Sequence, residues 1–137
     1  GNDCVDLSFS KANLDFINGI FIKDKVISLG ENSVINVNRV KAENSAIGIV
    51  SKDNTQLYIS DFFHEKVALP LAAYIKKPEF GKPYIKIKNM IPRNFNLDFI
   101  SDDSIVEIED QKILGRNKSS EVSNLLYGNL YGVKTNR

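Results

Sequence analysis

The side chains that most often perform catalysis are scarce in this chain, which holds one histidine, His64, and one cysteine, Cys4. A single histidine excludes every metal site that needs two or more imidazole ligands. Cys4 and His64 could form a nucleophile and its base, but that chemistry needs a firmly held nucleophile, and chains are commonly frayed near a terminus. We therefore predict no catalytic residue and no metal site.

The chain also lacks the short motifs that bind cofactors. It has no glycine-rich phosphate loop, and the segment from Gly128 to Gly132 lacks the strand-then-helix context of a dinucleotide site. Carboxylates are paired at Asp102 and Asp103 and at Glu107 and Glu109, but the spacing of a calcium-binding loop is missing. We interpret these carboxylates as solvated and expect no cofactor.

Charge is distributed unevenly in the second half of the chain. Residues 76–93 hold six basic side chains against one acidic, and residues 98–110 hold six acidic side chains and no basic one. If the two blocks form neighbouring antiparallel strands, Lys86 and Lys88 lie opposite Glu107 and Glu109. Each exposed ion pair would then contribute about 0.2–1 kcal/mol.

The basic block could instead bind a ligand. Alternation places Tyr84, Lys86 and Lys88 on one exposed strand face, which combines an aromatic platform with cations that neutralise phosphate. The candidate binding residues are Tyr84, Lys86, Lys88, Lys76, Lys77 and Arg93. They predict an OB-like barrel that binds single-stranded nucleic acid. The formal net charge of +1 and the absence of Trp count against a dedicated nucleic-acid surface.

A third class of function is protein recognition. Eight Phe, five Tyr and frequent Asn residues suit a surface of aromatic anchors and adaptable polar contacts. The segment from Val67 to Ala73 is apolar on both faces, as in a central strand or an edge strand interrupted by Pro70. Because catalytic motifs are missing, we favour a non-catalytic binding or structural module that acts through contacts with another protein. The nucleic-acid domain is the alternative.

Alternation of apolar and polar residues is the main signal for secondary structure. Ile85 and Ile87 alternate with Tyr84, Lys86 and Lys88, which is the period of a half-buried strand. The same period appears in four other segments, at residues 5–9, 34–38, 96–99 and 106–109. Parallel strands are usually buried on both faces. We therefore predict an all-β, mainly antiparallel fold.

Turn-forming residues separate these segments. Asn18-Gly19 predicts a type I′ hairpin, and further turns are expected at residues 30–32, 52–54, 78–81 and 92–94. The turns recur at roughly 8 to 12 residues, as in sandwiches and barrels. No internal repeat with a period of roughly 20 to roughly 50 residues is visible by inspection. We predict a single domain over residues 1–137, a β-sandwich of about seven to nine strands, with a closed or OB-like barrel as the alternative.

The C-terminal region carries the clearest helical signal. Ser119 or Ser120 can cap a helix, and Val122, Leu125 and Leu126 recur at helical spacing. We predict a short C-terminal helix of about two turns that covers an open edge or an end of the sheet.

Composition indicates a folded chain. Of the 137 residues, 42% are hydrophobic and 26% are charged, which is typical of a globular domain. The longest apolar stretch, Val67 to Ile75, is about half the roughly 20 residues of a membrane-spanning helix, so we predict no transmembrane segment. A single cysteine excludes an intrachain disulfide. The start at Gly1 without Met is consistent with a removed leader, and we expect a periplasmic or secreted bacterial protein.

Overall fold

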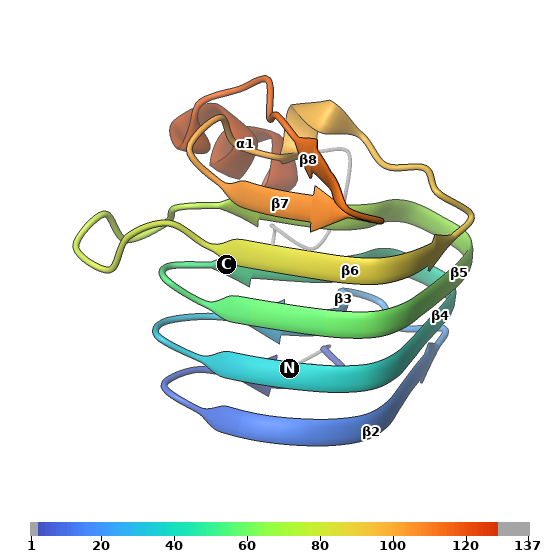
Figure 1. The fold of residues 1–137 in the computed structure, drawn as a ribbon. Coiled ribbons are helices and arrows are strands. Elements are labelled where there is room, and N and C mark those ends of the chain that lie inside the picture. The colour runs from blue at the N-terminus through green and yellow to red at the C-terminus, as the bar shows by residue number, and fades with distance from the viewer. Residues whose placement is uncertain (1–2, 129–137) are drawn as a thin grey trace.

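The protein is a β-solenoid, in which the chain winds through successive stacked coils (Figure 1). The computed structural model describes residues 3–128. Its elements, in chain order, are β1 (Val5–Leu7), β2 (Lys11–Ile20), β3 (Lys25–Leu29), β4 (Val34–Lys52), β5 (Gln56–Tyr74), β6 (Tyr84–Ile91), the 3-10 helix η1 (Leu97–Phe99), β7 (Ile105–Ile108), β8 (Gln111–Ile113) and α1 (Ser119–Leu126). Neighbouring strands in this part of the chain are parallel, except β7 and β8.

The coils of the solenoid are nearly constant in length. Side-chain hydrogen bonds between stacked coils join residues that are 22 or 23 positions apart, as from Asn36 to Asn13. Between β5 and β6 the spacing grows to 28 positions, from Asp61 to Asn89, because the loop at residues 75–83 is inserted there. The coil length therefore changes where a loop intervenes and is otherwise maintained.

Each coil runs along two walls that face each other. The front wall consists of β2, residues 34–43 of β4, residues 56–65 of β5, β6 and β7. The back wall consists of β1, β3, residues 45–52 of β4 and residues 67–74 of β5. The backbone takes a positive φ where the chain bends between the walls, at Phe21, Asn44 and Lys66. These bends stack because the coils have matching lengths.

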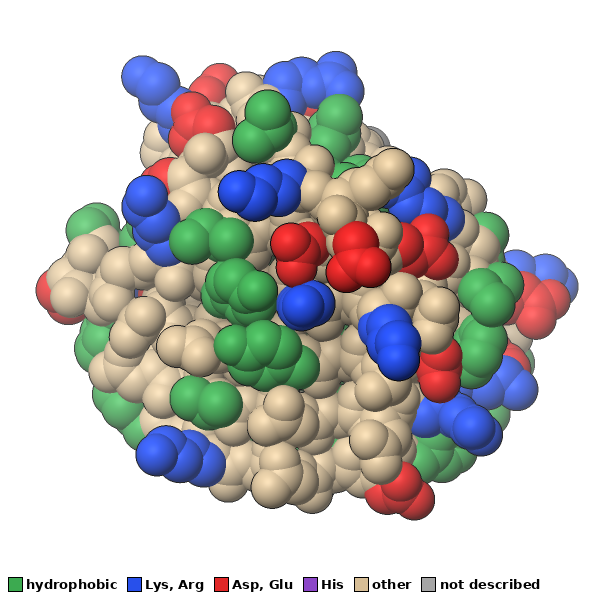
Figure 2. Space-filling model, viewed as in Figure 1, with side chains coloured by type: hydrophobic (Ala, Val, Ile, Leu, Met, Phe, Trp, Pro, Cys, Tyr) green, Lys and Arg blue, Asp and Glu red, His purple; other side chains and the backbone are tan. Residues whose placement is uncertain are grey.

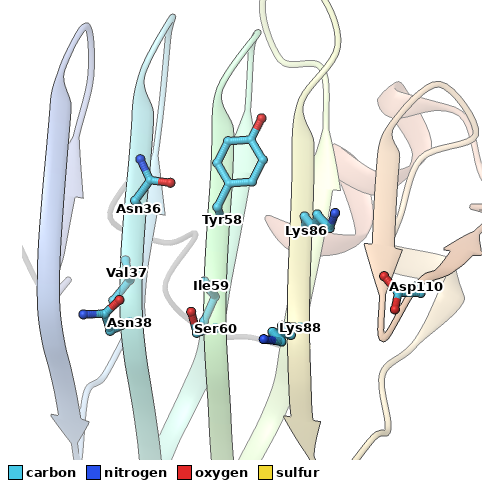
Figure 3. Close-up of a pocket in the computed structure, with 9 residues that line it drawn as sticks. All are labelled: Asn36, Val37, Asn38, Tyr58, Ile59, Ser60, Lys86, Lys88 and Asp110. Carbon is cyan, nitrogen blue, oxygen red and sulfur yellow. The ribbon is translucent and has the colours of Figure 1, made fainter.

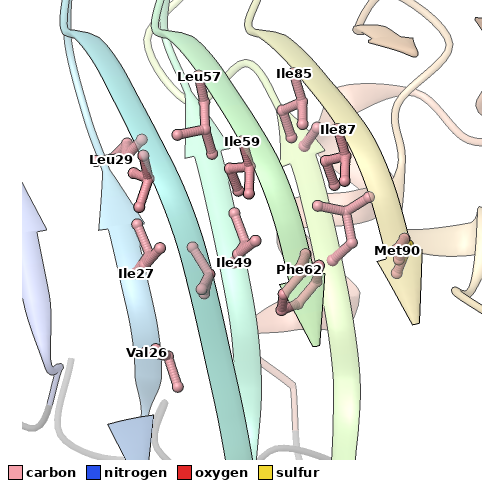
Figure 4. Close-up of a cluster of buried hydrophobic side chains, with 14 of the residues drawn as sticks. Val26, Ile27, Leu29, Ile49, Leu57, Ile59, Phe62, Ile85, Ile87 and Met90 are labelled. Atoms are coloured by element: carbon pink, nitrogen blue, oxygen red, sulfur yellow. The ribbon is translucent and has the colours of Figure 1, made fainter. Parts of the chain in front are cut away.

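The hydrophobic core lies between the two walls and is built from columns of stacked side chains. One column of the front wall contains Ala12, Ile35, Leu57, Ile85 and Val106, and the next contains Leu14, Val37, Ile59, Ile87 and Ile108. Figure 4 shows several of these side chains opposite those of the back wall, among them Ile27, Leu29 and Ile49. Burial of each large aliphatic side chain contributes about 1.5–3 kcal/mol, so these columns dominate the stability of the fold.

The predicted C-terminal helix is confirmed as α1, and it covers the outer surface of the back wall. Val122 and Leu126 are buried against a second hydrophobic cluster that includes Ile47, Leu69 and Tyr74. Its first turn is closed by Glu121, whose carboxylate accepts the Lys118 N–H at 2.9 Å. The helix therefore buries a face of the sheet instead of an edge. No helix among residues 3–128 is long and apolar enough to span a membrane.

The predicted antiparallel sandwich and its barrel alternative are wrong, because the sheet is mostly parallel. Each coil turns once around the solenoid, so successive passes along one wall run in the same direction without crossover helices. Parallel strands are buried on both faces where helices cover both sides of a sheet. Here the outer surface of the front wall is exposed, and parallel strands carry the alternation that antiparallel strands usually show.

Two local predictions also fail. Asn18 and Gly19 lie inside β2, where a Cβ atom on Gly19 would approach the methyl groups of Val26 to 2.7 Å, so glycine serves close packing instead of a hairpin. The segment from Leu97 to Phe99 forms η1 instead of a strand, with the Asn96 side chain accepting the Asp98 N–H. The expected turns at residues 30–32 and 52–54 are present, but each joins the back wall to the front wall.

Candidate functional site

The outer surface of the front wall carries three of the six predicted site residues. Tyr84, Lys86 and Lys88 project from β6 on its exposed side, as the alternation predicted. Figure 2 shows this face: hydrophobic and charged side chains gather over its upper strands, and uncharged polar side chains cover much of the lower ones. The face therefore changes character from the last coils to the first.

Two tyrosines form the aromatic part of this face. The rings of Tyr58 on β5 and Tyr84 on β6 lie 5.5 Å apart between centroids and are tilted by 46°. Both rings are half-buried, and the Tyr58 hydroxyl donates to the Gln56 Oε1 at 3.3 Å. The strand register aligns Tyr58 with Lys86, so the aromatic pair borders directly on the basic side chains.

A shallow depression of about 430 Å³ lies beside these tyrosines. Figure 3 shows its two rows of side chains: Asn36, Tyr58 and Lys86 in one row, and Asn38, Ser60 and Lys88 in the next. Asp110, in the turn after β7, borders the depression on the far side of β6. Amide, hydroxyl, aromatic and charged groups thus converge on one open surface.

Asparagine side chains form ladders across the lower strands of this face. The Asn36 amide donates to Asn13 Oδ1 at 3.1 Å, and the Asn38 amide donates to Asp15 Oδ1 at 2.9 Å. Each bond joins residues 23 positions apart, one coil below the other. These residues were not among the predicted site residues, although the spacing of Asn13 and Asn36 repeats the coil length and could have indicated them.

The predicted cross-strand charge pairing is present in part. Lys86 Nζ lies 3.6 Å from Glu107 Oε2, and the two residues are in register between β6 and β7. The strands are parallel instead of antiparallel, but the same neighbours meet. Glu109 instead contacts Arg93, whose Nε lies 3.2 Å from its carboxylate. Within residues 3–128, Lys88 makes no ion pair.

The other three predicted site residues lie away from the tyrosine pair. Lys76 and Lys77 belong to the loop at residues 75–83, where Lys77 forms an ion pair with Glu31. The hydrogen bond from Lys77 lowers the pKa of Glu31 to about 2. Arg93 follows β6 and stacks over the Phe95 ring at 5.9 Å, besides its contact with Glu109. The basic block therefore does not form one continuous patch.

The histidine and the cysteine occupy different surroundings. His64 is 7% exposed on β5, and its Nε2 lies 2.7 Å from the Pro92 carbonyl oxygen, to which it donates. Cys4 is exposed near the first residues, where its N–H donates to the Lys25 carbonyl. The small depression beside His64 is lined by neighbours from β4, β5 and β6, without Cys4. No cluster of three or more His, Cys, Asp or Glu side chains suited to a metal ion occurs in residues 3–128.

Burial of His64 makes stability depend on pH. Burial lowers the pKa of His64 below its ordinary value of 6.5, and the bond to the Pro92 carbonyl only partly opposes this. The unfolded chain therefore binds the proton more readily, and stability is full above about pH 6.5 and falls as pH drops through the interval between the two pKa values. We expect the urea unfolding midpoint of His64→Gln to change less between pH 7.5 and pH 5 than that of the wild type. Parallel pH curves for the two proteins would contradict this role of His64.

The first coil leaves one edge of the front wall open. β2 pairs with β4 on one side, and no described strand pairs with its other side. The Val34 N–H donates to the Ser10 carbonyl at 2.8 Å, and alternate residues of a parallel strand face the same neighbour. Ala12 and Leu14 therefore direct their backbone groups toward β4. The residues between them direct theirs to the open side.

Exposed apolar side chains accompany this edge. Phe9, Phe16, Ile20 and Phe21 all belong to the first coil, and Phe21 is 74% exposed. They are four of the eight large hydrophobic residues exposed among residues 3–128. Large apolar groups concentrated at one end of a protein mark an interaction surface more often than single scattered ones.

Comparison of the chain with protein-family models, curated proteins and solved structures finds no match.

Proposed function

We propose that the protein is a non-catalytic binding module that joins another protein by accepting one of its strands at the open edge of β2. The observation that supports this is the length of the edge, which has ten residues. At the opposite end, the sheet finishes with β8, which has three residues. Proteins usually keep exposed edge strands short or covered, because an unpaired edge accepts a strand from another chain.

The open edge presents defined backbone groups to such a partner. Lys11, Asn13 and Asp15 alternate with the residues that face β4, so their N–H and carbonyl groups point to the open side. These three positions can each give two hydrogen bonds to an added strand. The hydrogen bonds would supply affinity that does not depend on the side chains of the partner.

The core columns define the side chains that the partner needs. The columns end at Ala12 and Leu14, which are only half-buried because nothing described lies below them. An added parallel strand would place apolar residues over both if its apolar residues fall at every second position. We therefore propose a partner segment that is extended and alternates apolar with polar residues.

A strand peptide tests this proposal. The probe is a fluorescein-labelled peptide of residues 34–43, which already forms a strand of this kind beside β2 in the folded chain. We expect saturable binding in fluorescence anisotropy. Asn13→Pro removes one open-side N–H and should weaken binding about tenfold. Asn13→Ala is the matched control, because both variants lose the bond to Asn36 but only the proline loses the N–H.

Two results would contradict the proposal. One is the absence of binding at millimolar peptide, and the other is equal binding by the Asn13→Pro and Asn13→Ala variants. If the protein itself dimerises, and Asn13→Pro alone abolishes the dimer in sedimentation velocity, the proposal is supported with a second copy as the partner protein.

A further inference from the structure

Three depressions on the front wall form a continuous track. The first is lined by Gln56, Tyr58 and Tyr84 among others, and it shares Tyr58 with the depression shown in Figure 3. That depression shares Asn38 and Ser60 with a third, which continues to Asp61. The track follows β5 from Gln56 to Asp61, a length of roughly 16 Å at the usual rise of a strand. An elongated ligand fits this shape better than a compact one.

The groups along the track can bind a sugar chain. The Tyr58 and Tyr84 rings offer flat apolar surface for the C–H face of a sugar ring, and their hydroxyl groups can form hydrogen bonds. Sugar hydroxyls both donate and accept, and amides offer both functions at fixed positions. Asn36 and Asn38 each use one N–H within the asparagine ladders, which holds the amide in place. Figure 3 shows the Asn36 carbonyl oxygen on the side of Tyr58.

The charges along the track almost cancel. The basic residues that line it are Arg39, Lys82, Lys86 and Lys88, and the acidic ones are Asp15, Asp61 and Asp110. Glu107 further neutralises Lys86 at 3.6 Å. A nucleic acid needs an excess of cations to displace its counterions, and phosphates would lie close to these carboxylates. A neutral ligand avoids both costs.

We infer that the track from Tyr84 through Tyr58 to Asp61 binds a neutral, extended polysaccharide. The rings of the two tyrosines stack on successive sugars, and the amides of Asn36 and Asn38 bond the hydroxyls of the sugars that follow. The track meets β2 only at its far end, where Asp15 and Phe16 line it, whereas the two tyrosines lie on β5 and β6.

Affinity electrophoresis tests the inference with defined neutral polysaccharides. Native gels are cast with hydroxyethylcellulose, xyloglucan, galactomannan or pullulan, and the mobility of the intact protein is compared with that in a plain gel. We expect at least one polysaccharide to retard the protein. Tyr58→Ala should raise the apparent Kd about tenfold or more, and Tyr84→Ala should act in the same direction. Phe63→Ala is the matched control, an aromatic residue of β5 that does not line the track.

Three outcomes would overturn the inference. The first is no retardation in any of the four gels, and the second is equal retardation of the wild type and both tyrosine variants. The third is binding of an oligothymidine that depends on Tyr58 and weakens steeply with salt, which would assign the track to single-stranded nucleic acid. Lys11→Pro removes another open-side N–H but keeps the bonds of Asn36 and Asn38, so it should weaken the peptide and leave the retardation unchanged. Failure of the strand-addition proposal and failure of this inference are therefore distinguishable.

Discussion

Replacing Leu57 with alanine is expected to lower the free energy of unfolding by about 2–5 kcal/mol. Leu57 is fully buried in the middle coil, with Ile35 below it and Ile85 above it in the same column. A solenoid is stabilised by contacts between adjacent coils, so a cavity here weakens two interfaces at once. Urea unfolding with linear extrapolation measures the loss.

Gln56 provides the matched control for this substitution. It precedes Leu57 on the same strand but is exposed. We expect Gln56→Ala to change stability by no more than about 0.5 kcal/mol. A loss of less than about 1 kcal/mol for Leu57→Ala would contradict the column arrangement, because a side chain outside a packed core is the simplest cause of so small an effect.

Asp53→Ala is the second substitution for which we expect a large loss, of about 2–4 kcal/mol. Asp53 is 1% exposed, and its Oδ1 accepts the backbone N–H groups of Lys76 and Lys77, both at 2.8 Å. These bonds tie the loop at residues 75–83 to the turn between β4 and β5. Alanine leaves two N–H groups without their acceptor, and urea unfolding should report the loss.

Two further substitutions at Asp53 separate the carboxylate from the backbone. Asp53 has a φ of 52°, which alanine tolerates poorly and glycine and asparagine tolerate well. We expect Asp53→Gly to lose about as much as the alanine variant, and Asp53→Asn to lose less than half as much because an amide oxygen remains. If Asp53→Gly is as stable as the wild type, backbone strain and not the carboxylate explains the alanine result.

The strands of the fold could be predicted from alternation, but their direction could not. Ile85 and Ile87 point into the core and Lys86 and Lys88 point outward, as expected. Period-two alternation reports which side of a strand is buried, and it is the same for parallel and antiparallel neighbours. The direction depends on how the chain returns between strands, which is set by the bends at Phe21, Asn44 and Lys66.

The repeat is hard to see in the sequence because equivalent positions of successive coils hold residues of the same class but not the same residue. Ser10, Ser33 and Thr55 occupy equivalent turn positions, and each carbonyl accepts the N–H of the first residue of the front-wall strand one coil above. Ala12, Ile35 and Leu57 are likewise equivalent without being alike. Counting apolar residues at the fixed offset of one coil would have revealed the solenoid, and counting identical residues does not.

The candidate site was predictable only where one strand supplies it. Tyr84, Lys86 and Lys88 share a face because they alternate on β6. Tyr58 and Asn36 join them from coils one and two turns away, which requires the strand register. Lys76, Lys77 and Arg93 are close to β6 in sequence, but the chain leaves the front wall at both ends of that strand. The function and the extracytoplasmic setting remain predictions.

Residue-resolved hydrogen exchange of β2 reports directly whether a strand adds at its open edge. The amides of Ala12 and Leu14 face β4 and should be protected in the free protein, whereas those of Lys11, Asn13 and Asp15 should exchange fast. Saturation with the peptide of residues 34–43 should protect the second set and leave the rest of the front wall unchanged. Peptide binding that leaves Lys11, Asn13 and Asp15 unprotected would contradict strand addition at this edge.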